Sequence, residues 1–512
     1  MALADYFPRD ALAISQVLQG FDTDTFTEEL EGVRVAIAFD EEAATSRDGR
    51  YLLDLSVRLA ARLYPSLTFF PVSARAEFPD DLIALAIRIN PNIETSKSGN
   101  AYVALSVGVH APAVDAPTVH AGCDGWVATV GTEGPYSTSD LGNPFGAGFA
   151  ACIAAANLFR FLFLPDGKTS LDTDASFPPD ADSFPRLVAS NLTDPLVLFG
   201  VGAVGNSTAW SLARTPLTGQ IHLVDPQVVE LSNLQRYILC ARSDEGGIKV
   251  DIAGQEFGGR LRALPHKEAL ASFLEANGYR WERILVALDS AHDRRAVQAS
   301  LPRWIANAWT QLGDLGVSSH SFLGQDACLA CLYLPSQKSK SDDQIIAEGL
   351  KIPQFQTQVR FLLGNGQATG KEICDAVASA WGIPTKNLDP YANRPIRELW
   401  VEGICGGGII PLGEAGPAPR ELQVPLAFQS ALAGVLLAAE VVIDVLTGGA
   451  RRKTLLRQMD VLSPLGELSP QPALKAGTGL CICEDDDFVA TYRAKYMAEE
   501  EIPVGVGLGQ VD

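Results

Sequence analysis

The sequence predicts an α/β fold made of two successive halves, each built on a largely parallel sheet. Segments with the apolar and aromatic composition of strands alternate with segments of helical apolar spacing, and this alternation occurs twice along the 512 residues. Each alternation ends in a long helix of small apolar residues, expected at 143–164 and at 431–446. We interpret the repeat as a degenerate internal duplication, with chance recurrence of Ala-rich helices as the alternative.

The first half is expected to cover residues 1–185. Its strands are expected at 33–39, 67–72, 101–107 and 126–130, and its helices at 51–64 and 80–88. Residues 165–185 are rich in Asp, Ser and Pro, which is typical of a linker.

The second half is expected to begin at residue 186 and to be interrupted by an insert. Strands are expected at 195–199, 220–224 and 283–288. Polar, Pro- and Gly-rich sequence with a few helical segments then follows, and an insert of that length inside a compact unit is usually functional. The expected boundaries are 186–335 for the first part of this half, 336–423 for the insert, 424–490 for its completion and 491–512 for a flexible tail.

The charge balance excludes two classes of partner. The formal net charge of −21 argues against sequence-independent binding to nucleic acid or to anionic membranes, because that affinity comes from Lys and Arg. The N-terminal sequence lacks a basic stretch followed by an apolar run, so we expect no secretory signal and a cytoplasmic protein. The apolar stretches 146–164 and 431–446 contain charged residues and are expected to be buried helices.

A glycine-rich turn identifies a candidate nucleotide site. Gly200, Gly202 and Gly205 follow a predicted strand and open a predicted helix, in the order GxGxxG. The glycines permit a tight turn, and the helix N-terminus directs N–H groups at phosphate. Asp225 follows the next strand, where a carboxylate accepts hydrogen bonds from ribose hydroxyls. These features predict a Rossmann-like nucleotide binder, and dinucleotide dehydrogenases share them.

The residues after Asp225 decide between these classes. Asn233 and Arg236 lie in the segment SNLQRY, and Lys249 and Asp289 follow in the same order. In this order the sequence resembles the ThiF-like adenylyltransferase family, which includes ubiquitin-activating enzymes and the activators of sulfur-carrier proteins. The family pattern SNLNRQ is matched except for Gln235 and Tyr237.

The resemblance implies that a protein carboxylate attacks the α-phosphate of ATP. This reaction brings anions together, so cations must offset the charge. Arg236 and Lys249 are expected to contact the triphosphate, Asn233 to donate to the developing adenylate, and Asp289 to hold Mg²⁺. The first half would be an inactive adenylation-like half and the second the active one. The family also implies an arginine from the partner half, for which Arg186 is one candidate.

Two pairs of cysteines predict a metal centre. Cys328 and Cys331 have CxxC spacing, and Cys481 and Cys483 form a second pair near the C-terminus. In the resembled family two such pairs make one structural Zn²⁺ site. The alternative is four buried structural thiols.

The remaining cysteines include a candidate acceptor thiol. Cys405 is followed by three glycines that could let its loop move, so we expect it to accept the carrier as a thioester. Cys374 has the spacing of a core face, and Cys240 and Cys152 lie in apolar segments and are expected in the core. Cys123, close to His120, leaves open a conjugating-enzyme-like domain over residues 1–180.

The expected function is ATP-dependent activation of a ubiquitin-like protein, followed by transfer to Cys405 and handover to a conjugating-enzyme-like partner. By analogy, an acidic protein of this kind would suit a bacterial ubiquitin-like conjugation system of antiphage defence operons. The alternatives are sulfur-carrier activation without a stable thioester, an NAD-dependent oxidoreductase and a non-catalytic nucleotide-binding scaffold. A homodimer is possible.

Overall fold

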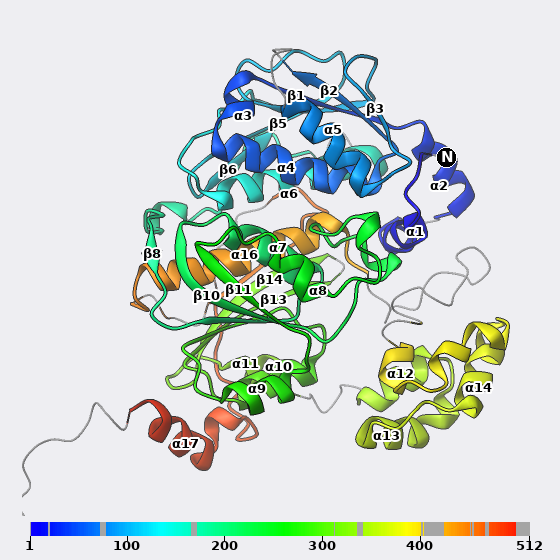
Figure 1. Ribbon diagram of the computed structural model, residues 1–512, viewed down its shortest axis with the longest axis vertical. Helices are drawn as coiled ribbons and strands as arrows, with labels where there is room; N and C mark the ends of the chain where they lie inside the picture. The colour runs from blue at the N-terminus through cyan, green and yellow to red at the C-terminus, as the bar shows by residue number, and fades with distance from the viewer. Residues whose placement is uncertain are drawn as a thin grey trace, which may run out of the picture.

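Two sheets with the same strand order form the two halves of the protein (Figure 1). The computed structural model describes residues 2–18, 21–71, 78–164, 171–311, 313–334, 341–400, 403, 424–450, 452, 455–465 and 471–497. When the two-residue strand at Ser190–Asn191 is set aside, the first strand of each half is central, the second and third lie on one side of it, and the fourth and fifth lie on the other. Antiparallel strands then extend each sheet, two in the first half and three in the second, so the topology supports the interpretation of an internal duplication.

The first sheet has the order β3-β2-β1-β4-β5-β6-β7. Its strands are β1 (Arg34–Phe39), β2 (Ser66–Pro71), β3 (Glu94–Ser96), β4 (Val103–Val107), β5 (Thr118–Asp124), β6 (Val127–Gly131) and β7 (Ala175–Phe177). The segment expected to be a linker therefore contributes the seventh strand. Sequence reasoning did not find β3, β5 or β7, because two of them have only three residues and β5 carries polar residues and a glycine.

The second sheet has the order β11-β10-β9-β12-β13-β14-β15-β16, and β8 pairs with β10. Its strands are β8 (Ser190–Asn191), β9 (Leu196–Phe199), β10 (Leu217–Val224), β11 (Leu261–His266), β12 (Arg283–Val286), β13 (Trp304–Gln311), β14 (Asp314–Ser321), β15 (Leu455–Met459) and β16 (Gln471–Pro472). Strands β9 to β13 are parallel to one another. The fully buried β9 is a continuous apolar run, and so is β12 after its first residue, Arg283, as strands covered on both faces are.

Four helices fill the space between the two sheets (Figure 1). They are α4 (Arg47–Leu63) and α6 (Pro144–Phe163) of the first half, and α7 (Ala203–Ala213) and α16 (Ala427–Leu446) of the second. Small residues bring α7 and α16 together: a Cβ on Gly434 would lie 2.3 Å from the carbonyl oxygen of Val204. Helices α6 and α16 are long and apolar enough to cross a membrane, but 83% of the apolar 18-residue stretch in each is buried inside the protein, as expected of core helices.

The other helices of the two halves cover the outer faces and the ends of the strands. They are α1 (Phe7–Ser15), α2 (Thr23–Glu31), α3 (Glu41–Thr45), α5 (Phe78–Ile89), α8 (Lys249–Gly254), α9 (Leu270–Asn277), α10 (Ala291–Ala299), α11 (Leu329–Leu332) and α17 (Asp486–Tyr496). Short 3₁₀ helices are η1 (Ala181–Ser183), η2 (Leu231–Asn233), η3 (Arg242–Asp244) and η8 (Ile482–Glu484).

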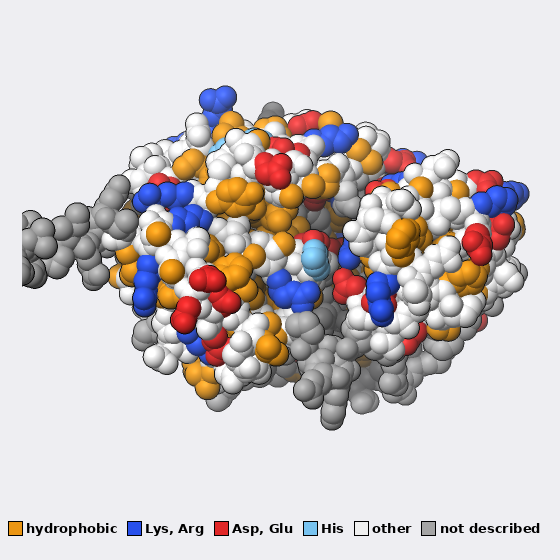
Figure 2. Space-filling view, turned by 90° about the horizontal axis from the view of Figure 1, so that it is seen from below, with side chains coloured by type: hydrophobic (Ala, Val, Ile, Leu, Met, Phe, Trp, Pro, Cys, Tyr) orange, Lys and Arg blue, Asp and Glu red, His pale blue; other side chains and the backbone are white. Residues whose placement is uncertain are grey.

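The insert folds as a small group of helices that stands apart from the second sheet (Figure 1). It contains α12 (Asp342–Gly349), η4 (Pro353–Phe355), α13 (Gln356–Asn365), α14 (Lys371–Trp381), η5 (Thr385–Asn387), η6 (Asp389–Tyr391) and α15 (Ile396–Glu398). Figure 2 shows the face that carries this insert and α17, where described acidic and basic side chains lie interspersed with hydrophobic ones.

Buried arginines of α4 join the first half to the second within one chain. The guanidinium of Arg58 donates to the carbonyl of Ile238 at 2.9 Å, and Arg62 donates to the carbonyl of Cys240 at 2.7 Å. Asp54 accepts from the indole N–H of Trp210 in α7 at 2.9 Å. Because Arg58 and Arg62 are buried and donate across the junction, the halves dock in cis.

Candidate nucleotide site and metal centre

The glycine turn lies where the parallel strands of the second sheet end. The N–H of Gly200 donates to Val224 and the N–H of Ala287 donates to Phe199, at 3.0 and 2.9 Å, so the ends of β9, β10 and β12 lie side by side. Strands β10 and β12 lie on opposite sides of β9 in the sheet. The strand order therefore reverses at this edge, and open α/β sheets bind ligands at such a switch point.

Two of the three glycines have no room for a side chain. Gly200 has φ +88°, and its Cβ would lie 2.6 Å from the carbonyl oxygen of Ala287. A Cβ on Gly205 would lie 2.1 Å from the carbonyl oxygen of Gly200. Gly202 precedes the first residue of α7 and provides no side-chain cap, so the N-terminal N–H groups of the helix remain directed at the site.

Asp225 holds the turn through its carboxylate. One oxygen accepts from the N–H of Val201 at 2.8 Å, and the other accepts from the N–H of Gln227 at 2.9 Å. The side chain is nearly buried beside the turn. The structure thus places Asp225 at the predicted nucleotide site, and its contact with ribose stays a prediction.

Lys249 is buried at the start of α8 and points to the same edge. Its ammonium donates to the Gln227 side-chain oxygen at 2.7 Å and lies 5.2 Å from the centre of the Tyr237 ring. Burial by itself lowers the pKa of Lys249, but Tyr237 and Asp225 outweigh it, so the pKa is raised overall. The lysine is therefore kept charged in a buried position, where a cation acts strongly on an anionic ligand.

Tyr237 is a site residue that sequence reasoning treated only as a departure from the family pattern. Its ring contacts two cations, Lys249 and the guanidinium of Arg236, whose central carbon lies 5.9 Å from the ring centre. A Cβ on Gly202 would lie 3.5 Å from the Tyr237 hydroxyl oxygen, so the hydroxyl faces the glycine turn. The mismatch to the pattern was itself the signal that could have identified this residue.

Replacing Tyr237 with phenylalanine is expected to shift the pH profile of nucleotide binding. The hydroxyl supports the raised pKa of Lys249, so its removal lowers that pKa. The cation is present below the folded pKa and is lost as pH rises through it, so Tyr237→Phe should lose ATP affinity at lower pH than the wild type. Titration with a fluorescent ATP analogue across alkaline pH measures this. If ATP affinity falls at the same alkaline pH in Tyr237→Phe as in the wild type, the prediction is contradicted.

The other predicted residues of the nucleotide site, Asn233, Arg236 and Asp289, lie at the same edge of the sheet and differ in burial and in hydrogen-bond partners. Asn233 ends η2, and its side-chain oxygen accepts from the N–H of Glu230 at 3.1 Å. Arg236 is partly buried on the segment that follows. Asp289 is exposed, two residues beyond Ala287 at the end of β12. The contacts of these three residues with ATP and Mg²⁺ stay predictions.

The first half carries an aspartate where the second half carries its glycine turn. Asp40 directly follows β1, as Gly200 follows β9. Its carboxylate accepts from the N–H groups of Ala43 and His110, at 2.8 and 3.0 Å, and thereby caps α3. A Cβ on Gly108 would lie 2.3 Å from this carboxylate. The backbone donors at this edge are therefore already bound to a fixed anion.

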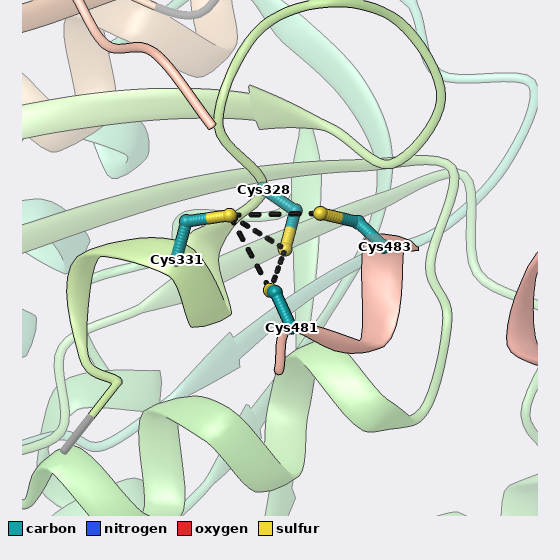
Figure 3. A group of neighbouring side chains, drawn as sticks. All are labelled: Cys328, Cys331, Cys481 and Cys483. Atoms are coloured by element: carbon teal, nitrogen blue, oxygen red, sulfur yellow. Dashed lines mark hydrogen bonds between the residues drawn. The ribbon is translucent and has the colours of Figure 1, made fainter. Parts of the chain in front are cut away.

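The four predicted metal ligands converge at the far side of the second sheet (Figure 3). The sulfur atoms of Cys328 and Cys481 lie 3.5 Å apart, and those of Cys331 and Cys483 also lie 3.5 Å apart. A tetrahedral zinc with Zn–S bonds of about 2.3 Å separates its sulfurs by about 3.8 Å. All four sulfurs lie within 4.8 Å of one another, so the cluster could hold a metal ion of this size.

Replacing Cys481 with serine is expected to remove the metal and to loosen the C-terminal helix. The cysteine pairs join α11 to η8, which directly precedes α17, and a structural metal contributes directly to the stability of the segments that it joins. The wild type should contain about one zinc per chain by elemental analysis. Cys481→Ser should lose it and become cleavable by protease near α17, whereas wild-type protein that is free of metal and equally resistant would contradict the prediction.

The other described cysteines are buried. Cys123, Cys152, Cys240 and Cys374 are each at most 3% exposed, and burial raises the pKa of every one of these thiols, that of Cys240 to about 12. The core positions expected for Cys152, Cys240 and Cys374 are confirmed. Cys405, the predicted acceptor, lies outside the described residues.

A comparison with known families decides the class of the site. Residues 192–467, more than half of the chain, match the model of the ThiF family. The chain belongs to the ThiF family. Membership confirms the resemblance inferred from Asn233, Arg236 and Lys249, and it identifies an E1-like adenylyltransferase rather than an oxidoreductase. Residues 38–164 match a second model, described as Prokaryotic E2 family C.

Individual relatives of this ThiF-family chain differ greatly in coverage. The uncharacterized protein y4jF of Sinorhizobium fredii is 40% identical over 509 residues, which is 97% of this chain and 98% of that protein. The Nedd8-activating enzyme E1 catalytic subunit of Drosophila melanogaster is 29% identical over 109 residues, 21% of this chain and 24% of that protein. Escherichia coli MccB, solved with ATP, has 13% identity and a TM-score of 0.33, covering 56% of this chain and 65% of that one.

Proposed function

We propose that this protein uses ATP to adenylate the C-terminal carboxylate of a ubiquitin-like or sulfur-carrier protein. The observation that carries the proposal is the buried Lys249, held beside Asp225 and Tyr237 at the glycine turn of a ThiF-family domain. Among the described residues, no carboxylate is bonded to the Lys249 ammonium, so its charge is available for a ligand. The anionic ligand expected at this edge is a triphosphate.

The chemistry follows from the charges that gather at this edge. The carrier carboxylate attacks the α-phosphorus of ATP and forms an acyl-adenylate, while the bond to pyrophosphate breaks and pyrophosphate leaves. Lys249, Arg236 and the N–H groups at the start of α7 offset the negative charge that develops on the phosphates. When bound, Mg²⁺ would neutralise further phosphate charge, and Asp289 would hold it. Asn233 would donate to the adenylate.

We propose Arg9 as the arginine that the first half supplies. Arg9 lies in α1 next to Asp10, whose carboxyl accepts a hydrogen bond from Gln235 and is acted on by the charges of Arg236 and Arg9. Arg9 is therefore close to the nucleotide-site arginine. Arg186, the candidate from the sequence, is exposed and precedes β8, which pairs with the first residues of β10, whereas the site lies beyond the last.

The activated carrier would next be transferred to Cys405. The described chain resumes after this cysteine at Val424, whose N–H donates to the side-chain oxygen of Gln16 at 3.0 Å. The carbonyl of Pro425 accepts from the side chain of Gln235, the neighbour of Arg236, at 3.5 Å. Val424 and Pro425, the first described residues after Cys405, thus lie beside the nucleotide site. This supports attack of the Cys405 thiolate on the acyl-adenylate carbonyl, with AMP as the leaving group, and handover to a conjugating-enzyme-like protein.

We propose that the first half is inactive toward nucleotide, since Asp40 binds the backbone donors that a phosphate would need. The match to the E2 family model raises a second role for this half, transfer of the carrier through its own cysteine. Residues 1–185 contain only Cys123 and Cys152, and both are buried. A buried thiol with a raised pKa is a poor acceptor, so we place the acceptor at Cys405.

Zinc is the metal that the four-cysteine centre fits best, because thiolate ligands in a tetrahedral set favour it. We propose a structural Zn²⁺ there. Homodimer formation and a role in antiviral defence stay predictions.

Exchange of radiolabelled pyrophosphate into ATP tests the proposed function. The protein should catalyse exchange only when a ubiquitin-like carrier with a free C-terminal carboxylate is present, and carrier lacking its last residues should give none. Full exchange without carrier, or reduction of NAD in its place, would overturn the proposal.

A further inference from the structure

A chain of buried hydrogen bonds crosses the second half from the nucleotide edge to the metal centre. It starts at Arg294 in α10, whose guanidinium donates to the side-chain oxygen of Asn307 at 2.6 Å. The Asn307 amide donates to the hydroxyl of Ser318 at 3.3 Å. The remaining links join Ser318 to His320 at 2.8 Å and His320 to the carbonyl of Ala327 at 2.9 Å.

Only one arrangement of protons satisfies this chain. The carbonyl of Ala327 accepts, so the Nδ1 of His320 must carry the proton and its Nε2 must accept from the Ser318 hydroxyl. Arg294 only donates, so the Asn307 side chain must present its oxygen to Arg294 and its amide to Ser318. All donors therefore point the same way, and aligned hydrogen bonds in a dry interior strengthen one another. The four side chains are at most 6% exposed.

Both ends of the chain hold a peptide group that adjoins a functional residue. At one end Arg294 also donates to the carbonyl of Leu288, which precedes Asp289. At the other end His320 holds the carbonyl of Ala327, which precedes Cys328. A second link runs beside the first, because the Tyr333 hydroxyl, two residues beyond Cys331, accepts from Arg294 at 2.7 Å.

We propose that Arg294, Asn307, Ser318 and His320 couple the metal centre to the Asp289 loop, so that zinc bound to the cysteines holds Asp289 in position. They are positioning residues, since they act through the two peptide groups that they hold. The role of Asp289 in binding Mg²⁺ rests on the proposed function, whereas the coupling itself does not. Because coupling between two sites is reciprocal, breaking the chain weakens zinc binding and loosens the Asp289 loop together.

Ser318→Ala breaks the chain at its centre: the His320 Nε2 loses its partner, and the Asn307 amide keeps only its bond to the Tyr333 hydroxyl, at 3.2 Å. Ser300→Ala is the matched control: Ser300 is buried at the end of α10, and its hydroxyl bonds only locally, to the carbonyl of Val297 at 2.7 Å. Both full-length variants are measured without ATP or carrier. Zn²⁺ affinity comes from competition with a chromogenic chelator, and loop stability comes from amide hydrogen exchange in the peptide that contains Asp289.

We expect Ser318→Ala to bind Zn²⁺ about tenfold more weakly and to exchange the amides around Asp289 about tenfold faster, while Ser300→Ala matches the wild type. Stripping zinc from wild-type protein should accelerate the same amides. The proposal is overturned if Ser318→Ala changes only one of the two readouts, or if zinc removal leaves the Asp289 amides unchanged. Ser318→Thr, which keeps the hydroxyl, should restore both. If the protein shows no carrier-dependent ATP–pyrophosphate exchange, the proposed function is wrong, but the measured Zn²⁺ affinity and amide exchange are unaffected.

Discussion

Lys249→Ala is expected to reduce carrier-dependent ATP–pyrophosphate exchange by about 100- to 1,000-fold, because a buried charge that stabilises a transition state is worth that much. The ammonium is nearly buried, donates to Gln227 and lies over the Tyr237 ring, so solvent screens it little. Water that enters in its place supplies no net charge. We expect the loss in kcat as well as in ATP affinity, since charge builds up on the phosphates during the reaction.

Lys97→Ala is the control for this prediction. Lys97 is half-exposed and pairs with Asp80 on the surface of the first half, so its removal should leave exchange unchanged. Circular dichroism and thermal unfolding establish that Lys249→Ala is folded. Exchange in Lys249→Ala within a few-fold of the wild type would mean that the triphosphate does not lie beside this residue.

Cys405→Ala is expected to abolish the carrier adduct completely while ATP–pyrophosphate exchange stays within about twofold of the wild type. Exchange requires only the adenylate, whereas the thioester requires a thiolate nucleophile, and alanine supplies none. The measurement is a gel shift of enzyme incubated with carrier and ATP, with and without a thiol reductant that cleaves thioesters.

Cys374→Ala is the matched control, because Cys374 lies in the same insert but is buried in α14. It should keep the reductant-sensitive adduct. An adduct that survives in Cys405→Ala and disappears in Cys374→Ala or in Cys123→Ala would move the acceptor role to that residue. Carrier-dependent exchange without an adduct in the wild type would instead indicate sulfur-carrier adenylation without a stable thioester.

The sequence was most informative where chemistry requires particular residue types at short range. The glycine turn is an example, since Gly200 and Gly205 have no space for a Cβ and their pattern is therefore visible in the chain itself. The cysteine pairs are another, because CxxC brings two thiolates to one metal by local geometry. Most of the strands of the first half, the strands β9, β10 and β12 and the two small-residue helices were likewise predictable from apolar periodicity, whereas the eight-residue strands β13 and β14 were not predicted.

Features that depend on contacts between distant segments were not predictable in the same way. The three-residue strands β3 and β7 are too short to show a period, and they form because neighbouring strands offer free hydrogen-bonding edges. Tyr237 looked like a departure from a pattern, and its role beside Lys249 arises from the fold of the segment between β10 and α8.

The sequence by itself determined the two α/β halves, the glycine turn and the four cysteines that could hold a metal ion, because these follow from local spacing and residue chemistry. Only the tertiary structure decided that the halves dock in cis through Arg58 and Arg62 and that Asp40 binds the donors of the first half. It also decided that Arg294 and His320 connect the Asp289 loop to the cysteines. The physical reason is that buried polar groups must find partners, and no local pattern records which ones they find: the partners of Arg58 and Arg62 are 180 and 178 residues away, and the His110 partner of Asp40 is 70 residues away.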